Sequence, residues 1–311
     1  MVRPKVSIAL CTYNGARFLR EQINSMLVQT YPAHEIVVVD DCSTDETLDI
    51  VKEFASQYSF IKYSVNDHNL GFVQNFSHAI SKTCGDYVAL ADQDDIWTED
   101  HIELLLKNIG QNAVCVGDAI MIKSDGTNTG IKYSEIKHNY VISSDNISNA
   151  YRIVYNTNPY QGASMLIDRK WVQSFLPITS EAVFHDTYLA GCSSLTQGIN
   201  AISCIITKYR MHEYQVSKPR KQSAIDDIKH LRHRIFYPHK IYMVDSVLRK
   251  APKLSQETIS FIDEFNHIRD LDRQNSRLSI LKILNHHYKE IYSLDSYKWI
   301  VLRSLHFLFS L

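Results

Sequence analysis

A chain of 311 residues allows one large domain or two ordinary ones, with a sizeable buried core. Its net charge of −1 gives no strong field for nucleic acid or another polyanion, so we expect no nucleic-acid partner. The six cysteines form no C-x-x-C pair and several lie in apolar runs, which favours reduced, buried thiols over disulfides or a zinc site. Because neither a signal-peptide core nor an apolar run of roughly 18 residues occurs, we expect a cytoplasmic chain without a membrane-spanning helix.

The first third of the chain alternates apolar strands with amphipathic helices. We expect strands at residues 6–11, 35–40, 60–65 and 87–91, and helices at about 16–29, 44–57 and 72–82. No hairpin signal lies between these elements, so the alternation predicts right-handed parallel βαβ units. In such a sheet, ligands bind beyond the carboxyl ends of the strands.

The strand at 87–91 runs directly into three carboxylates, those of Asp92, Asp94 and Asp95. Close carboxylates repel one another unless a cation or a protonated neighbour relieves them. Hard divalent cations such as Mg²⁺ and Mn²⁺ bind carboxylates together with substrate phosphates. The pattern therefore suggests a metal–diphosphate site on Asp92 and Asp94. It also fits an acidic turn in which Asp92 or Asp95 caps the following helix.

Two other strand ends carry polar residues that would reach the same sheet edge. Asp40 or Asp41 could accept a hydrogen bond from a base or a ribose hydroxyl, and Thr12 could bond the base. Simple turn chemistry is the alternative for the two acids. No G-x-G-x-x-G follows the first strand and no P-loop sequence occurs, which counts against a dinucleotide site and excludes a P-loop.

Five stretches in order now carry a resemblance, at residues 6–15, 29–32, 38–45, 69–71 and 91–97. They resemble the nucleotide-sugar half of an inverting family-2 glycosyltransferase of the GT-A fold. The last stretch resembles the D-x-D motif in its A-D-Q-D-D-[VI]-W form, which is typical of bacterial enzymes that build O-antigen, capsule and related polysaccharides. The resemblance covers about residues 4–217.

This resemblance implies an α/β fold with a GT-A-type, Rossmann-like mixed sheet flanked by helices. It implies a catalytic domain at 1–217, with a nucleotide-sugar half at 1–98 and an acceptor half at 99–217, and a helical C-terminal extension at 218–311. The metal, Mn²⁺ or Mg²⁺, would be bound by Asp92, Asp94 and His212. The expected nucleotide-sugar contacts are Thr12, Tyr13, Asn14, Asp40, Asp41, Asn69, Gly71, Asp92 and Arg210. The expected acceptor-side residues are Asp95, Trp97, Gly162 and Ala163.

The acceptor half carries weaker patterns. We expect a helix at 100–109, a strand at 113–122, a polar loop at about 130–150 and an apolar strand after Gly162. Gly162 either lets the backbone approach a ligand closely or marks a glycine bulge in a buried strand.

Asp186 precedes a predicted helix, in a stretch that resembles the family's acidic motif. Inverting transfer is a direct displacement at the anomeric carbon and needs a base for the acceptor hydroxyl. The resemblance assigns that base to Asp186, and an ordinary helix N-cap is the alternative.

Residues 205–217 resemble the family's Y-R-x-H-x-x-N-x-x segment. Arg210 would help to neutralise the leaving group, and His212 would complete the metal site or contact the diphosphate. A structural histidine is the alternative, and Gln215 replaces the usual Asn.

The last third of the chain predicts helices at 255–275, 276–292 and 297–311, after a basic segment at 208–250. These helices either cap the catalytic domain or rest on a membrane surface. A peripheral position on the inner face of the cytoplasmic membrane would suit the lipid-linked acceptor that the family implies.

The expected function is metal-dependent inverting transfer of a hexosyl or deoxyhexosyl group, from a nucleotide-sugar to a saccharide or lipid-linked oligosaccharide in bacterial surface polysaccharide synthesis. A sugar nucleotidyltransferase is one alternative, but residues 12–15 lack the glycine-rich, basic phosphate loop that it would need. A non-catalytic nucleotide-binding scaffold of a polysaccharide assembly complex is another, and the intact carboxylates speak against it.

Overall fold

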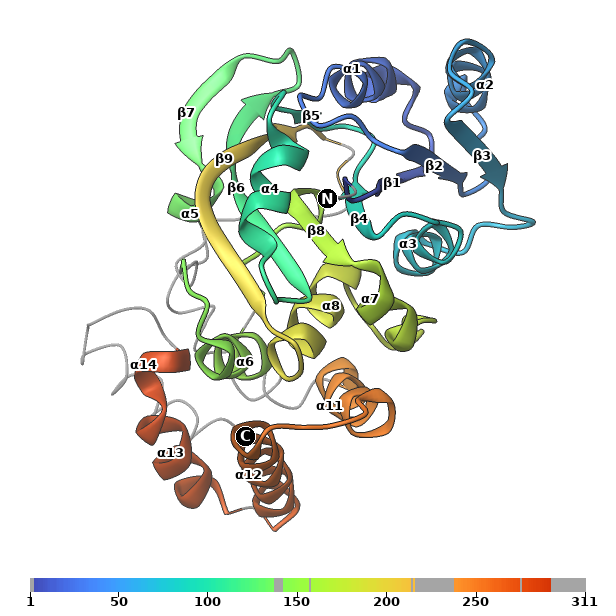
Figure 1. Cartoon of the computed structure of the whole chain (residues 1–311). Coiled ribbons are helices and arrows are strands. Elements are labelled where there is room, and N and C mark those ends of the chain that lie inside the picture. Colours follow the sequence, from blue (N-terminus) through green and yellow to red (C-terminus); the bar gives the residue numbers. More distant parts are fainter. Residues whose placement is uncertain are drawn as a thin grey trace.

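The computed structural model is built around a nine-stranded mixed sheet with helices on both faces and a further helical layer below (Figure 1). Its strand order is β3-β2-β1-β4-β8-β6-β9-β5, with β7 paired to β6. The structure describes residues 3–136, 142–156, 158–213, 215, 238–274 and 276–291.

Four parallel strands with crossover helices form the first half of the sheet, as the sequence predicts. The strands are β1 (Val6–Thr12), β2 (Glu35–Asp40), β3 (Ile61–Val65) and β4 (Tyr87–Ala91). The helices between them are α1 (Ala16–Leu27), α2 (Thr47–Gln57) and α3 (Phe72–Ser81). The parallel arrangement brings the carboxyl ends of β1, β2 and β4 to one edge.

Alternate residues of the central strands face two separate cores. In β1, Ile8 and Leu10 pack with α1, α2 and α4 (His101–Ile109), whereas Ala9 and Cys11 face the core that contains α3. Burial on both faces requires continuous apolar runs, and this is why the strands could be located from sequence.

The second half of the sheet mixes strand directions. β8 (Met165–Asp168) lies antiparallel between β4 and β6 (Val114–Lys123), and β9 (Ile199–Met211) runs parallel to β6. The short strand β5 (Ile96–Trp97) is antiparallel to β9, so the turn after β4 is held between the two halves. The predicted GT-A-type mixed sheet is thus confirmed.

The predicted polar loop at about 130–150 is wrong. This stretch contains the end of β7 (Asn128–Lys132), α5 (Tyr133–Ile136) and the start of α6 (Asn146–Tyr155), while residues 137–141 lie outside the described part. Asp145 caps α6 by accepting from the N–H groups of Ile147 and Ser148. α6 is buried because α8, α12 and α14 cover it. The sequence of α6 alone does not predict these distant contacts.

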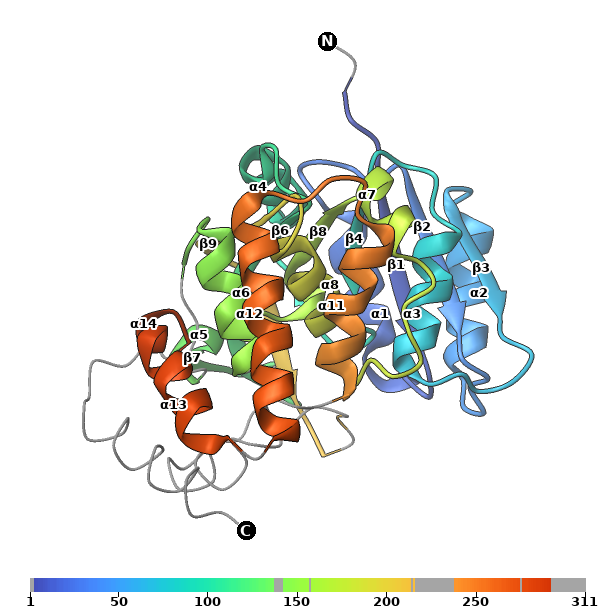
Figure 2. The ribbon, with the colours of Figure 1, turned by 90° about the horizontal axis from the view of Figure 1, so that it is seen from below.

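Two further helices connect this half, α7 (Arg169–Phe175) and α8 (His185–Ser194). The C-terminal helices then lie across α6 and α8 (Figure 2). They are α11 (Pro238–Lys250), α12 (Gln256–Arg273), α13 (Arg277–His286) and α14 (Tyr288–Ile291).

The C-terminal helices share a core with the helices that lie against the sheet. Phe261 and Phe265 of α12 pack against Tyr155, and Lys250 donates to the Phe175 carbonyl at 3.0 Å. The described helices therefore act as a cap. The helix predicted at 255–275 is confirmed, and the one predicted at 276–292 is divided into α13 and α14.

The predicted boundary between residues 217 and 218 and the predicted helix at 297–311 lie outside the described residues. Within the described part of the chain, no helix is both long and apolar enough to cross a membrane.

Candidate active site

The ends of β1 and β2 are tied together around the Asp40 carboxylate. One of its oxygens accepts from the hydroxyls of Thr12 (2.8 Å) and Ser43 (2.6 Å), and the other accepts from the Ser43 N–H at 2.8 Å. Asn14, whose φ is 48°, accepts from the Thr44 N–H at 2.8 Å. Asp40 and Thr12 are buried, so they shape this edge from inside. Their predicted contact with a base stays a prediction.

The Asp41 carboxylate holds the loop before α3 by accepting hydrogen bonds from it. Its carboxylate accepts from the side chain of Asn66 (2.7 Å) and from the N–H groups of Leu70 (2.8 Å) and Gly71 (2.9 Å). Gly71 has a φ of 75°, which glycine adopts without strain. Asn69 donates to the Asp41 carbonyl at 3.2 Å. The predicted nucleotide residues 12–14, 40–41 and 69–71 thus meet at one edge.

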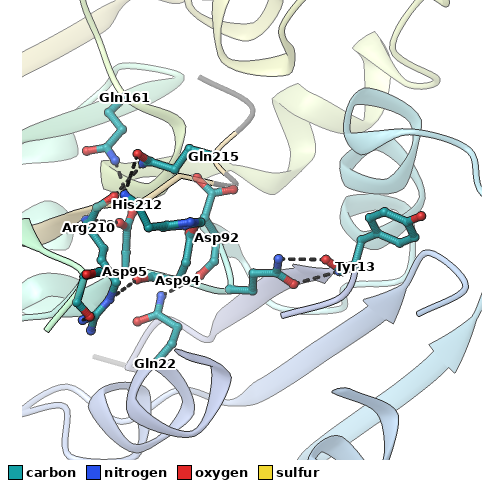
Figure 3. Close-up of polar contacts among 11 residues, drawn as sticks. Tyr13, Gln22, Asp92, Asp94, Asp95, Gln161, Arg210, His212 and Gln215 are labelled. Carbon is teal, nitrogen blue, oxygen red and sulfur yellow. Dashed lines mark hydrogen bonds and ion pairs between the residues drawn. The ribbon is translucent and has the colours of Figure 1, made fainter. Parts of the chain in front are cut away.

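Tyr13 differs from these residues because 48% of its surface is exposed. Its backbone is held by Gln93, in the turn after β4, through two hydrogen bonds of 2.8 and 2.9 Å (Figure 3). The local sequence around Gln93 does not identify Tyr13 as its partner, because the two residues lie 80 positions apart.

Arg210 and Asp95 support the acidic turn from behind. Asp95 is 1% exposed and accepts from the Arg210 N–H at 2.9 Å and from Gln161 at 3.2 Å. The Arg210 guanidinium donates to the carbonyls of Asp94 (2.8 Å) and Ser124 (3.1 Å), and to the Glu21 carboxylate at 2.6 Å. Burial and the charges of Asp94 and Asp92 raise the pKa of Asp95 well above its usual range. The structure therefore places Arg210 and Asp95 inside the protein.

Asp94 and His212 are brought together as expected. His212 Nε2 lies 2.7 Å from Asp94 Oδ2, and its ring packs against Phe18 with the centroids 5.0 Å apart. Gln215 accepts from the His212 N–H at 3.1 Å and donates to the Arg210 carbonyl. Gln215 thus holds the chain beside His212.

The charge of Asp186, on α8, acts on Asp92 in this turn. Burial raises the pKa of Asp92 to about 8, and the charges of Asp94 and Asp186 add to the shift. Asp186 lies in the first turn of α8, where its carboxylate accepts from the Thr187 N–H. The N-cap position belongs to Phe184, so Asp186 is not the cap residue. The predicted base therefore lies near the acidic turn.

Of the predicted acceptor-side residues, Gly162 lies beside the predicted base, whereas Ala163 and Trp97 lie in the core. A Cβ added at Gly162 would lie 2.7 Å from His185 Nε2 and 3.4 Å from Asp186 Cβ, so Gly162 passes directly beside the predicted base. Ala163 is fully buried. Trp97 is 3% exposed and stacks on His101 with the ring centroids 3.8 Å apart. The structure does not bring Ala163 or Trp97 to a surface where an acceptor could touch them.

The acidic turn fits a cation that substrate phosphates would complete. Among the described residues, no group of three or more His, Cys, Asp or Glu side chains is arranged to hold a metal by itself. Mg²⁺ commonly takes one or two carboxylates and receives its other ligands from water and phosphate. The carboxylates of Asp92 and Asp94 suit that pattern as a pair, whereas the described geometry does not add His212 as a third ligand of the same ion. A cation at this turn would offset the burial and the carboxylate repulsion that raise the pKa of Asp92.

Comparison with known proteins decides the family. Residues 7–176, more than half of the chain, match the family described as glycosyl transferase family 2. The chain belongs to this family. An uncharacterised glycosyltransferase of Haemophilus influenzae is 26% identical to this family-2 glycosyltransferase over 282 residues, which cover 85% of this chain and 83% of that protein.

A second relative has known structures. The Staphylococcus aureus poly(ribitol-phosphate) beta-N-acetylglucosaminyltransferase TarS is 29% identical over 136 residues, which are 43% of this chain and 23% of TarS. A crystallised TarS fragment matches with a TM-score of 0.53 at 19% identity, over 80% of this chain and 67% of that chain. The same fragment in complex with UDP-GlcNAc matches with a TM-score of 0.51 at 17% identity, over 92% and 81%. The family-2 glycosyltransferase therefore shares the TarS fold.

Proposed function

We propose that this family-2 glycosyltransferase transfers a hexosyl or deoxyhexosyl group, with inversion, from a nucleotide-sugar to a saccharide acceptor in the synthesis of a bacterial surface polysaccharide such as O-antigen or capsule. The observation that carries the proposal is the approach of two acidic elements. Gln161 donates to Asp95 of the turn after β4 at 3.2 Å, and the next residue, Gly162, lies directly beside His185 and Asp186 at the start of α8. A donor whose diphosphate lies at the turn would present its anomeric carbon to an acceptor beside Asp186.

In this arrangement Asp186 removes the proton from the acceptor hydroxyl as the new glycosidic bond forms, and the nucleoside diphosphate leaves from the opposite face of the sugar. Mn²⁺ or Mg²⁺, held by Asp92 and Asp94, would neutralise charge on the leaving diphosphate, and His212 would contact that diphosphate. The half-exposed ring of Tyr13 offers a stacking surface for the base.

The relatives support a class of donor and acceptor. TarS is named for N-acetylglucosaminyl transfer to poly(ribitol-phosphate), and its fragment was crystallised with UDP and with UDP-GlcNAc. For this chain we propose a nucleotide-activated glucose, galactose, rhamnose or N-acetylhexosamine as donor and a lipid-linked oligosaccharide as acceptor. Such an acceptor would bring the enzyme to the inner face of the cytoplasmic membrane, with peripheral contact through the C-terminal region.

A donor panel tests the proposal. Wild type and Asp94→Ala are incubated with UDP-, GDP- and dTDP-sugars in Mn²⁺, in Mg²⁺ and in EDTA, and the released nucleoside diphosphate is measured. We expect slow hydrolysis of one donor, lost in EDTA and in Asp94→Ala. Binding of a nucleotide without turnover would favour a scaffold. Turnover that is independent of metal would retire the roles proposed for Asp92 and Asp94, and no binding of any donor would overturn the proposed function.

A further inference from the structure

Gln93 lies between Asp92 and Asp94 in the chain, yet its side chain bonds to the backbone of Tyr13, just after β1. Its Nε2 donates to the Tyr13 carbonyl at 2.9 Å, and its Oε1 accepts from the Tyr13 N–H at 2.8 Å. One side-chain amide thereby satisfies both backbone groups of a single residue. Two hydrogen bonds in this arrangement fix the distance and the orientation of Tyr13 relative to the acidic turn.

Gly15 leaves room for this amide. A Cβ added at Gly15 would lie 2.1 Å from Gln93 Oε1 and 2.3 Å from its Cδ, far inside van der Waals contact. The φ of Gly15 is −108°, which other residues adopt readily. The nearby amide, rather than the backbone conformation, is therefore what requires a glycine here, and the two residues form one structural unit.

The contacts of Gln93 join two parts of the proposed donor site. The exposed ring of Tyr13 lies at one end of the link, and Asp92 and Asp94 lie at the other. A nucleoside diphosphate is long enough to use both parts, with its base at Tyr13 and its phosphates at the turn. A ligand that orders one end of a rigid link lowers the cost of ordering the other end.

We infer that Gln93 is a positioning residue that couples nucleotide binding at Tyr13 to cation and diphosphate binding at the turn. The inference rests on the proposed function, since it takes a nucleoside diphosphate as the ligand. It goes beyond the proposed function because it predicts that nucleotide and metal bind cooperatively. It assigns this coupling to Gln93, whose side chain bonds to the backbone of Tyr13.

A purely structural clamp would behave differently. It would lower stability when removed, but it would leave unchanged the ratio of nucleotide affinities with and without metal. Gln22 provides a matched control, because it holds the same turn by donating to the Asp92 carbonyl at 3.0 Å and makes no hydrogen bond to Tyr13. Gln22→Met loosens the turn and keeps the link intact.

The test is a double-mutant cycle on Gln93→Ala, Gly15→Ala and the double variant. Calorimetry measures the affinity for UDP, GDP or dTDP, whichever wild type binds most tightly, with and without saturating Mn²⁺. Because coupling between sites is typically 5–150-fold, we expect Gln93→Ala to reduce the Mn²⁺ enhancement by at least about 5-fold. We expect Gly15→Ala to do the same by displacing the amide, with no further loss in the double variant. Gln22→Met should keep the wild-type enhancement.

Two results would overturn the inference. One is an unchanged Mn²⁺ enhancement in folded Gln93→Ala, and the other is full additivity of the Gly15 and Gln93 changes. Gln93→Met, which keeps the length of the side chain, replaces Gln93→Ala if urea unfolding shows that the alanine variant is not folded. If wild type binds no nucleoside diphosphate, the proposed function fails first. If wild type binds one and the ratios do not change, the failure belongs to Gln93 alone.

Discussion

A variant of Arg210 distinguishes two roles for this residue. The sequence predicts a contact with the leaving group, whereas the structure shows Arg210 holding the acidic turn from inside the protein. Arg210→Met keeps much of the apolar stem but removes the donors that serve the carbonyls of Asp94 and Ser124. Both carbonyls are part-buried, and leaving such a carbonyl without its donor costs about 1–3 kcal/mol. The pair with Glu21, whose side chain is 60% exposed, adds less than about 1 kcal/mol. We therefore expect a loss of about 2–7 kcal/mol in the free energy of unfolding.

Urea unfolding monitored by circular dichroism measures this loss. Arg20→Met is the matched control, since Arg20 pairs with Glu53 at 2.6 Å on the surface and both side chains are about half exposed. The control should leave the free energy of unfolding close to the wild-type value, because water screens an exposed pair. If Arg210→Met unfolds like wild type while the KM for the donor rises, Arg210 contacts the diphosphate directly and the structural role is refuted.

Two further predictions concern the surroundings of Asp186 and the effect of acid. Gly162→Ala places a Cβ 2.7 Å from His185 Nε2, so we expect the first turn of α8 to shift and kcat to fall at least about 10-fold while donor affinity is retained; wild-type kcat in this variant would contradict the proposed close approach. Burial lowers the pKa of His101 and of His185 to about 3. At these two side chains the unfolded chain binds more protons than the folded chain between about pH 6.5 and pH 3, so their contribution to stability falls as the pH falls through this window. Between pH 7 and pH 5 each histidine should lower the free energy of unfolding by roughly 2 kcal/mol. The raised pKa values of Asp92 and Asp95 act in the opposite direction, because these folded carboxyls bind protons before the unfolded chain does. The share of His101 is therefore read from the difference between wild type and His101→Gln in urea unfolding at the two pH values; an equal pH dependence in the two proteins would contradict the burial argument.

The strands of the parallel half could be located from sequence because both of their faces are buried. Ile8 and Val38, for example, face one core while Ala9 and Val39 face the other, so the apolar runs have no polar interruption. The ends of such strands must lie at one edge, which is why the residues from β1, β2 and β4 were correctly grouped. Asp186 joined this group only through the family resemblance, since an acid at a helix start is common.

What the sequence could not provide was the set of partners from distant parts of the chain. Arg210 is engaged by Glu21 and Ser124, which lie 189 and 86 positions away. Gln93 meets Tyr13 across 80 positions. Trp97 follows the acidic motif and was expected to face an acceptor, but it stacks on His101 inside the core. In each case the local pattern gave the residue type and the tertiary contact decided its role.

The central claim is that Asp186 is the base, and Asp186→Asn tests it most directly. Asparagine keeps the size of the side chain but cannot remove a proton at neutral pH. Donor binding is measured by calorimetry and transfer to a saccharide acceptor by product formation, with wild type in parallel. The account predicts donor affinity within about 3-fold of wild type and a fall in kcat of about 10²–10⁴-fold. Transfer by folded Asp186→Asn at close to the wild-type rate would contradict it and would place the base on another residue.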